Sequence, residues 1–564
     1  MFSAACLIGF QFNFNRLTSN IPEQKWYGID APYDRYQDQV LYLGRVKLTW
    51  QASRATRVTL SYSTDFNDIV NASGYNNLNA ANLAPEAERR WKRGGHWVGL
   101  LVDSGLTDKL LLQVQTGVFY KNFLDDGIRT IDGQTDRINP SHQIVGATDA
   151  AVNNFVYNNS SLQWDAQTKW SAQFAPTLLY TARGLGGEHN LKGGMQLTYM
   201  HYTHNVGIPG GKQFVDNAPN GQPGAPCDPN DPRSFASCNQ LTVYPDSMPS
   251  GGRPGEGYTT TAQAINLGFF LQDRFTFKRW LTIVPGMRLD VGMLYDKDGA
   301  RLQSLLGFGP RLSFIYDLLH DRSTLIMAHY GRHNDIGNAG IADVGNPQMM
   351  GTRQRWDTAR NLFVEQNKFG GPGSQLFQTD LNLNPPNVDE VSVGVHREVF
   401  SQAVIAVDYT YRHYGNFWIN EEVNQIWDPA GTRVVGYVNG EARRIFVAET
   451  PSDASRTYHG LDLTLRGAPG RWDLLASYTL AFLNGTVTDF FTSNSYGFNP
   501  RLSPLFYGPL DGAPRHFLKG LVSYNFDFGL SIGTFLQFFT GAPLWKQFRS
   551  PEDQSYSLYR STRG

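Results

Sequence analysis

Residues 110–120 read LLLQVQTGVFY and alternate between apolar and polar side chains. The apolar side chains that share one face are Leu110, Leu112, Val114, Val118 and Tyr120. The opposite face carries Gln113, Gln115 and Gly117. A period of two is typical of a β-strand with one apolar and one polar face. About ten residues in a tilted strand cross a bilayer, so this segment predicts a strand of a transmembrane β-barrel.

The same pattern recurs on both sides of this segment, for example near residues 5–16, 41–51 and 55–66. Short turns are predicted near residues 52–54, 104–106, 184–187, 278–279, 320–321, 400–401, 469–470 and 527–528. Long, structureless loops rich in Asn, Gly, Pro and Asp are predicted near 67–93, 122–160, 204–260, 293–306, 331–387, 413–456 and 481–515. Outer-membrane barrels alternate short periplasmic turns with long extracellular loops in this way.

The repeated units predict an all-β fold, a transmembrane antiparallel up-and-down barrel, over the whole of residues 1–564. Bacterial barrels use even numbers of strands, so the pattern corresponds to about 17 of an expected 22 strands. The N-terminus also lacks a signal-peptide pattern. We therefore expect a partial barrel domain, without plug, signal peptide or terminal strands, from a longer protein.

The composition favours a barrel over other classes of protein. Lys and Arg number 49 against 50 Asp and Glu, so the net charge is −1, whereas nucleic-acid-binding domains are normally basic. No run of about eighteen apolar residues occurs, so no transmembrane helix is predicted. The aromatic share of 13% suits girdles of rings where a barrel meets outer-membrane lipid. The alternative is a large soluble β-protein with aromatic cores.

Two of the three cysteines, Cys227 and Cys238, lie in one polar, Pro-rich loop. They predict a disulfide bond, because such bonds persist in oxidising exteriors. The alternative is a pair of free loop thiols. Cys6 is expected to be an ordinary strand residue.

No catalytic motif with usable spacing occurs, so neither an enzyme nor a cofactor is predicted. His201 and His204 lie three apart in a strand, face opposite sides and are not expected to share a metal. The loop aromatics Trp356, Trp418 and Trp427 are candidate ligand-binding residues that would stack on a sugar or grip an apolar solute. The alternative is that these rings pack the loops against one another.

Four segments carry a resemblance to a known family. The first is a hairpin in which residues 269–275 read FFLQDRF and residues 280–290 read WLTIVPGMRLD, and the second and third comprise residues 383–398 and 458–479. Together with DGAPRHF at 511–517, they resemble the TonB-dependent outer-membrane transporters, and among them the Oar-like branch, whose members often carry a carboxypeptidase-regulatory-like N-terminal domain. The resemblance is sharpest between residues 260 and 543.

The resemblance implies a barrel in the bacterial cell outer membrane that actively takes up a scarce solute without a cofactor. It also implies an inner-membrane energy-coupling complex as partner, acting through a plug and a TonB box that this chain lacks. The motifs leave the solute unknown. Two alternatives stay open: an outer-membrane adhesion barrel without transport, and a passive porin.

The hairpin in the first of these segments is rich in charge. Gln272, Asp273, Arg274, Arg288 and Asp290 are expected to cluster around one periplasmic turn. A role in turn geometry is favoured over a role in transport.

Overall fold

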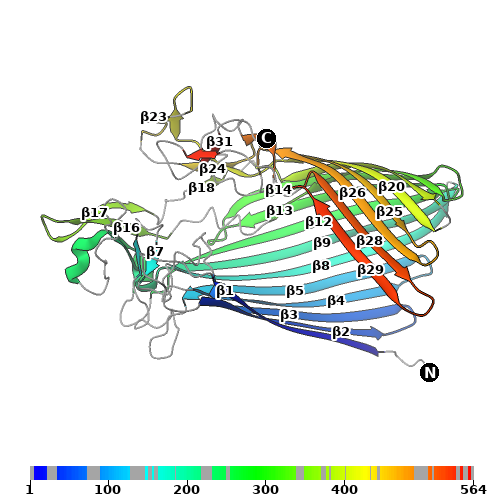
Figure 1. The fold of residues 1–564 in the computed structure, drawn as a ribbon, viewed down its shortest axis with the longest axis horizontal. Coiled ribbons are helices and arrows are strands. Elements are labelled where there is room, and N and C mark those ends of the chain that lie inside the picture. Colours follow the sequence, from blue (N-terminus) through cyan, green and yellow to red (C-terminus); the bar gives the residue numbers. More distant parts are fainter. Residues whose placement is uncertain are drawn as a thin grey trace.

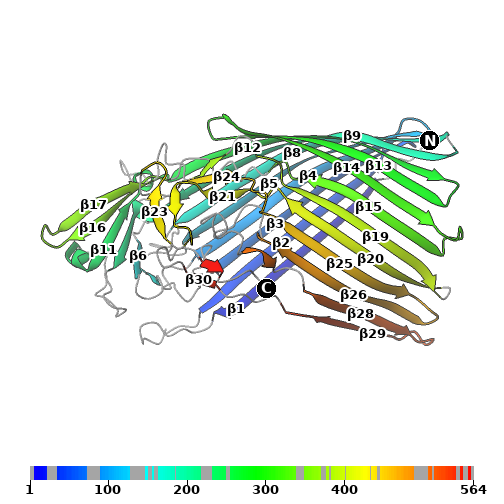
Figure 2. The same cartoon turned by 90° about the horizontal axis from the view of Figure 1, so that it is seen from above.

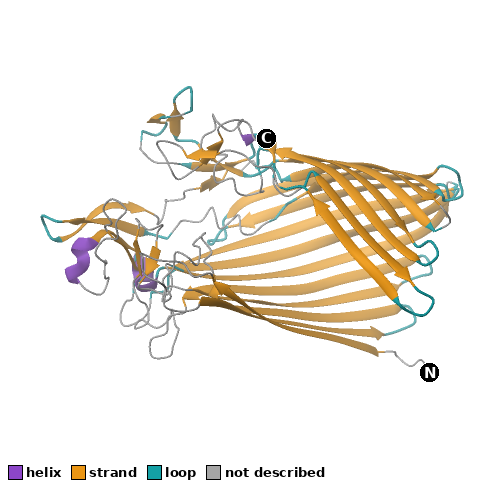
Figure 3. Cartoon of the chain, in the orientation of Figure 1, coloured by secondary structure: helices purple, strands orange, loops and turns teal. Residues whose placement is uncertain are grey.

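Long antiparallel strands follow one another around a strongly curved sheet in the computed structural model (Figure 1). The structure describes residues 6–21, 35–72, 89–127, 146–149, 155–157, 163–184, 186–216, 232–248, 255–337, 349–369, 377–379, 383–399, 402–431, 433–440, 445–487, 506–510, 514–541, 547–549 and 557–559. Strands dominate these residues (Figure 3). Among them, no helix is long and apolar enough to cross a membrane.

Among the described residues, the main sheet has 18 strands, one of which, β27 (Gly508–Pro509), has only two residues. The others are β1 (Cys6–Ile21), β2 (Arg35–Gln51), β3 (Thr56–Ala72), β4 (Arg89–Gly105), β5 (Leu110–Gly127), β8 (Trp164–Gly184), β9 (Gly187–Gly207), β12 (Tyr258–Phe277), β13 (Leu281–Tyr295), β14 (Arg301–Asp317), β15 (Thr324–Asn334), β19 (Asn387–Val399), β20 (Ala403–Gly415), β25 (Arg456–Gly467), β26 (Trp472–Gly485), β28 (His516–Asn525) and β29 (Ser531–Phe539). The predicted strand number is thus confirmed, with β27 as an addition.

Seven of the eight predicted short turns are confirmed, and they lie at one end of the sheet, on the right in Figure 1, whereas the turn predicted at 400–401 lies outside the described residues. Several of them need a positive φ, which glycine adopts without a steric penalty. Gly470 (φ 64°) and Gly529 (φ 90°) provide it between β25 and β26 and between β28 and β29. Lys278 and Arg279 adopt it between β12 and β13.

The predicted strand length of about ten residues is wrong. β8 and β9 each have 21 residues, and most other main strands exceed twelve. Only about 9–11 residues of a tilted strand are needed to cross the hydrocarbon layer. The main strands are therefore longer than a membrane crossing requires.

The prediction of structureless loops is also wrong. Loop segments build a six-stranded sheet beyond the barrel mouth from β6 (Gly146–Asp149), β7 (Phe155–Tyr157), β10 (Lys212–Asp216), β11 (Cys238–Val243), β16 (Gly351–Asp357) and β17 (Leu362–Phe369). A three-stranded sheet joins β18 (Phe377–Thr379), β24 (Phe446–Glu449) and β21 (Ile419–Glu422). These sheets pair segments from different loops, which local sequence patterns do not reveal.

Because of the register between neighbouring strands, side chains that face the same side of the sheet form continuous rows across it. One continuous row comprises Gln11, Arg45, Ser63, Trp97, Phe119, Ser171, Met200, Ala264 and Leu294. Ala264 and Leu294 in this row are covered by loop residues, so the row faces the lumen. The opposite face exposes Phe12, Val118 and many other apolar side chains, as expected for contact with lipid.

The sheet has two edges. β1 pairs with β2, and β29 pairs with β28. Within the described residues no pairing joins β1 to β29, and Figure 2 shows β28 and β29 along one margin of the sheet. Residues 295–541, from the end of β13 onward, form the half of the sheet that includes this margin.

Candidate functional site

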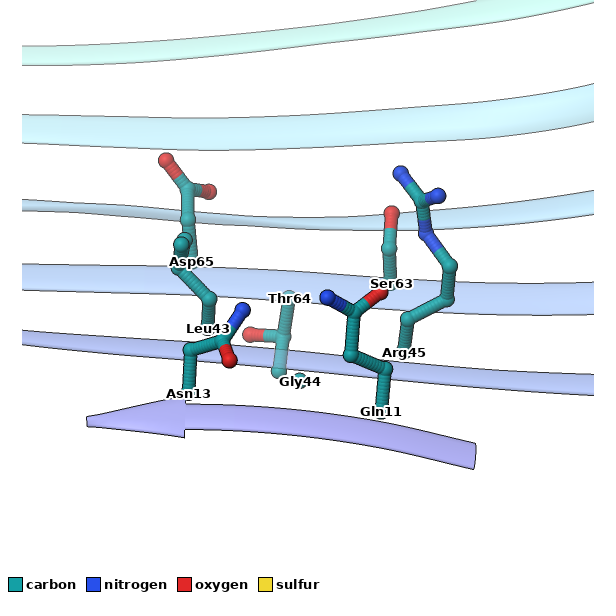
Figure 4. Close-up of a pocket in the computed structure, with 8 residues that line it drawn as sticks. All are labelled: Gln11, Asn13, Leu43, Gly44, Arg45, Ser63, Thr64 and Asp65. Atoms are coloured by element: carbon teal, nitrogen blue, oxygen red, sulfur yellow. The ribbon is translucent and has the colours of Figure 1, made fainter. Parts of the chain in front are cut away.

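The lumen face of β1, β2 and β3 contains a polar hollow of about 420 Å³. Gln11 and Asn13 of β1, Arg45 of β2 and Ser63 and Asp65 of β3 project into it from the same side of the sheet (Figure 4). They do so because they occupy alternate positions of paired strands. The hollow therefore offers amide, hydroxyl and charged groups side by side.

A second hollow of about 630 Å³ continues from the first across β3, β4 and β5. Arg45 and Ser63 line both hollows, and Gln115 and Trp97 line the second. The Trp97 side chain is 37% exposed although it lies on the polar face. Its indole lies along the wall over Gly99, where a Cβ would stand only 2.3 Å from the ring. Gly99 thus lets the ring lie flat.

Four exposed cations, Arg45, Lys47, Lys121 and Lys169, lie on this face. Lys121 and Lys169 are directly opposite each other in β5 and β8. The Lys169 ammonium also lies 4.8 Å from the centre of the Tyr202 ring. Among the described residues, no carboxylate is within 4.0 Å of any of the four cations. We call these four residues, with Trp97 and Phe119, the cationic wall.

The lumen face of β12–β20 differs, because three cation–carboxylate or histidine–carboxylate pairs lie on it. Arg311 of β14 also lies on this face and contacts His333. Arg288 Nε donates to Asp290 Oδ1 at 2.7 Å, and Arg412 Nε donates to Glu390 Oε2 at 2.6 Å. His396 Nε2 lies 3.0 Å from Asp408 Oδ1. We call these three pairs the paired wall.

The expected charge cluster at one periplasmic turn is therefore wrong. Arg288 and Asp290 lie well inside β13, where Asp290 is buried, and Arg288 also donates to Gln196 of β9 at 3.2 Å. Asp273 lies nearer the turn and instead contacts His189 at 2.7 Å. Residues 288 and 290 share the lumen face because alternate residues of a strand point to the same side. They lie far from the turn because each residue adds about 3.3 Å along the strand.

Extracellular loops cover part of the lumen wall above the paired wall. Trp418, Leu383 and Ala448 of the loops pack with Leu294 of β13 and Leu305 of β14 in one buried cluster. Trp418 is only 4% exposed, and its Nε1 donates to the carbonyl of Asn384 at 2.8 Å. This part of the barrel mouth is thus filled by protein.

The three candidate loop tryptophans lie in different places and are not brought together. Trp418 and Trp427 are buried, and Trp356 is half-buried with its ring 5.1 Å from that of Phe363, in a T-shaped contact. Their role in binding a ligand stays a prediction. Trp97 was not predicted as a candidate binding residue, although the sequence shows an aromatic residue between Gly95 and Gly99 on the polar face of a strand.

The remaining predicted residues have separate environments. His204 Nε2 lies 3.2 Å from Asp165, whereas His201 stacks on Trp170. No group of three or more potential metal-binding side chains occurs in the part of the chain that the structure describes. Cys238 is buried and disulfide-bonded, but Cys227 lies outside the described residues, so their pairing stays a prediction.

Tyrosine and histidine pair repeatedly on the outward face. The Tyr hydroxyl and His Nδ1 are 2.9 Å apart in Tyr62–His96 and 2.8 Å apart in both Tyr409–His459 and Tyr478–His516. Aromatic rings whose polar group is hydrogen-bonded are typical of the membrane–water interface. These pairs therefore identify the outward face as the one that meets lipid.

Comparison with known proteins agrees with this architecture. Residues 295–541 match the family described as outer membrane β-barrel domain. No match was found among curated proteins.

Several solved structures resemble the chain. The outer membrane transporter YddB from Escherichia coli superposes with a TM-score of 0.64 at 14% identity, over 98% of this chain and 64% of that one. FpvA from Pseudomonas aeruginosa, solved with bound pyoverdines, gives a TM-score of 0.53 at 11% identity, over 97% of this chain and 62% of FpvA. At such identities the likeness concerns the fold. Strand architecture, lipid-facing surface and family match together make this chain a β-barrel of the outer membrane.

Proposed function

We propose that this chain is the barrel portion of a TonB-dependent outer-membrane transporter of the Oar-like branch, which actively takes up a scarce solute. The observation that carries the proposal is the fold shared with the transporter YddB over 98% of this chain. A wide wall with polar hollows, and loops folded over its mouth, suits capture of a solute from outside. Transport needs no covalent step, so the proposal assigns no enzyme activity.

The proposal includes an energy-coupling partner in the inner membrane that acts through a plug and a TonB box. It also includes a longer gene product, of which residues 1–564 are a part. Sequencing the DNA on both sides of the reading frame tests these points. A signal peptide and plug upstream, with further strands downstream, are expected; a genuine start and stop without them would contradict this part of the proposal.

A second candidate function is adhesion, and the six-stranded loop sheet favours it. Arg353 and Arg355 of β16 are exposed on one face of that sheet, outside the barrel mouth. Such a surface suits contact with another cell or an anionic polymer. In this case, deleting the gene would reduce cell attachment and leave uptake unchanged.

Solute depletion from the growth medium tests the transport proposal. We would compare the parent strain with a strain lacking the reading frame, and follow medium components by mass spectrometry with and without a protonophore. The proposal predicts a component whose depletion needs both the gene and the proton-motive force. Depletion that survives the protonophore would indicate a passive porin, and equal depletion by the two strains would contradict transport.

A further inference from the structure

We propose that the cationic wall binds an acidic oligosaccharide, that is, a chain of several sugars that carry carboxylates. Trp97 and Phe119 would stack on the sugar rings, and Lys121 and Lys169 would bind the carboxylates. The inference names the solute class of the proposed transporter and in that sense rests on the proposed function. The site itself, however, is defined by the lumen wall alone.

The opposed lysines provide the first argument. Lys121 and Lys169 face each other across β5 and β8, and like charges in that position destabilise a sheet. Both side chains are exposed to the lumen, and the described residues place no carboxylate within 4.0 Å of either. A carboxylate between the two ammonium groups would relieve their repulsion. Positions that break a local rule in this way are typical of functional sites.

The exposed aromatics provide the second argument. Trp97 and Phe119 are opposite each other in β4 and β5, and their side chains are 37% and 38% exposed. They occupy the row next to the one that contains Lys121 and Lys169. On a polar face, an exposed ring has no lipid to meet. A flat, apolar ring face next to hydrogen-bonding groups suits a sugar, which has C–H groups on its faces and hydroxyls at its edge.

The polar neighbours fit the hydroxyls of such a ligand. The polar side chains in these two rows, besides the cations, are Gln11, Asn13, Ser63, Asp65 and Ser171, and Gln115 and Gln173 lie on the same face in neighbouring rows. Amides and hydroxyls both donate and accept hydrogen bonds, as sugar hydroxyls do. The wall can therefore form hydrogen bonds with a ligand rich in hydroxyl groups.

The extent of the wall sets the size of the ligand. Arg45 lies on β2 and Lys169 on β8, and the strands between them in the sheet are β3, β4 and β5. Four spacings of about 4.8 Å separate β2 from β8, which gives about 19 Å. That distance holds several sugar units in a row. A single sugar or a small carboxylic acid would reach only one end.

Isothermal titration of the full chain, purified in detergent from outer membranes, tests the inference with tetragalacturonate as the probe and neutral maltotetraose as its control. We expect saturable binding of tetragalacturonate that weakens with added salt, and at least tenfold weaker binding of maltotetraose. Replacing both lysines, by Lys121→Gln and Lys169→Gln, is expected to raise the Kd for tetragalacturonate at least tenfold. Trp97→Ala is expected to do the same.

Two control substitutions change residues outside the cationic wall. Lys109→Gln changes an exposed lysine in the β4–β5 turn, and Trp50→Ala removes an exposed ring from the lipid face. Both are expected to leave the Kd unchanged. Urea unfolding of every variant shows whether it is folded, and a single Lys121→Gln variant, which removes the repulsion, replaces the double variant if the latter does not fold.

Three results would overturn the inference: equal affinity for maltotetraose, an unchanged Kd in the wall variants, or protection of Trp97 from iodide quenching by protein that covers it. A ferric chelate that binds the same residues more tightly than tetragalacturonate would also overturn the assignment to a sugar. Binding without protonophore-sensitive uptake would contradict the transport proposal alone. Uptake that the wall variants leave unchanged would contradict this inference alone.

Discussion

The lumen wall has two halves that differ in how their charges are used. In the paired wall, Arg412 is held by Glu390, and loop residues such as Trp418 cover the neighbouring strands. In the cationic wall, Lys121 stands opposite Lys169, and the adjacent hollows remain open. The two halves share one sheet, one alternation of faces and one kind of strand.

The difference teaches that lumen-facing charge alone does not identify a binding surface. Charges that satisfy one another support the sheet and the loops above it, and their removal should affect stability first. Cations that have no carboxylate within 4.0 Å among the described residues contribute little to stability and are available to a ligand. Four experiments test this distinction, in decreasing order of expected effect.

Trp418→Ala should have the largest effect, because it empties a buried position over the paired wall. Removal of a buried tryptophan costs about 3–5 kcal/mol, here mainly in the docking of the loops on Leu294 and Leu305. Hydrogen exchange followed by mass spectrometry should report lost protection in residues 402–431. Trp356→Ala, at a half-buried position in the loop sheet, is the control and should leave those residues protected.

Charge removal should have opposite signs on the two walls. Arg412→Met leaves Glu390 without its partner and should destabilise the barrel by about 1–2 kcal/mol. Lys121→Met relieves the repulsion from Lys169 and should stabilise it by about 0.2–1 kcal/mol. Urea unfolding in phospholipid vesicles measures both changes. Destabilisation of similar size in the two variants would remove the distinction between the walls.

Gly99→Ala should displace the Trp97 indole, because the new Cβ would stand 2.3 Å from the ring. The ring can swing into the lumen, so the cost in stability should be only about 1 kcal/mol. A shift in tryptophan emission and weaker tetragalacturonate binding should accompany it. Gly9→Ala is the control on the same wall, since its Cβ would meet nothing within 4 Å.

The smallest effect concerns pH and the loops above the barrel. Burial raises the pKa of Glu421 in β21, and Glu449 and Asp453 raise it further. Because the folded state holds this proton more tightly, the loop sheet should be most stable below the ordinary pKa of 4.5 and lose stability as pH rises through the raised pKa.

Glu421→Gln removes this titration, so the loop sheet of the variant should not lose stability as the pH rises. Protection factors of β21 and β24 amides, corrected for intrinsic exchange rates, measure it at several pH values. The lipid-facing strands serve as the internal control. An identical pH dependence in the variant would assign the effect to other groups.

Local periodicity predicts the barrel but not what its surfaces do. The alternation in residues 110–120 and the turn at 184–187 depend on neighbours in sequence, and both are confirmed. The loop sheets pair β11 with β16, more than a hundred residues away, and such pairing has no local signature. Arg288 and Asp290 were placed too near the turn, although their spacing of two correctly indicates a shared face. The opposition of Lys121 and Lys169 requires the register of β5 and β8, which the sequence does not specify.

Cryo-electron microscopy of the protein purified from outer membranes, in the presence of tetragalacturonate, tests the contrast between the two walls most directly. We predict ligand density along the cationic wall, with carboxylates between Lys121 and Lys169 and sugar rings against Trp97, while the paired wall keeps its three side-chain pairs. Carboxylate side chains of the protein itself paired with Lys121 and Lys169, and no ligand on that wall, would contradict the account.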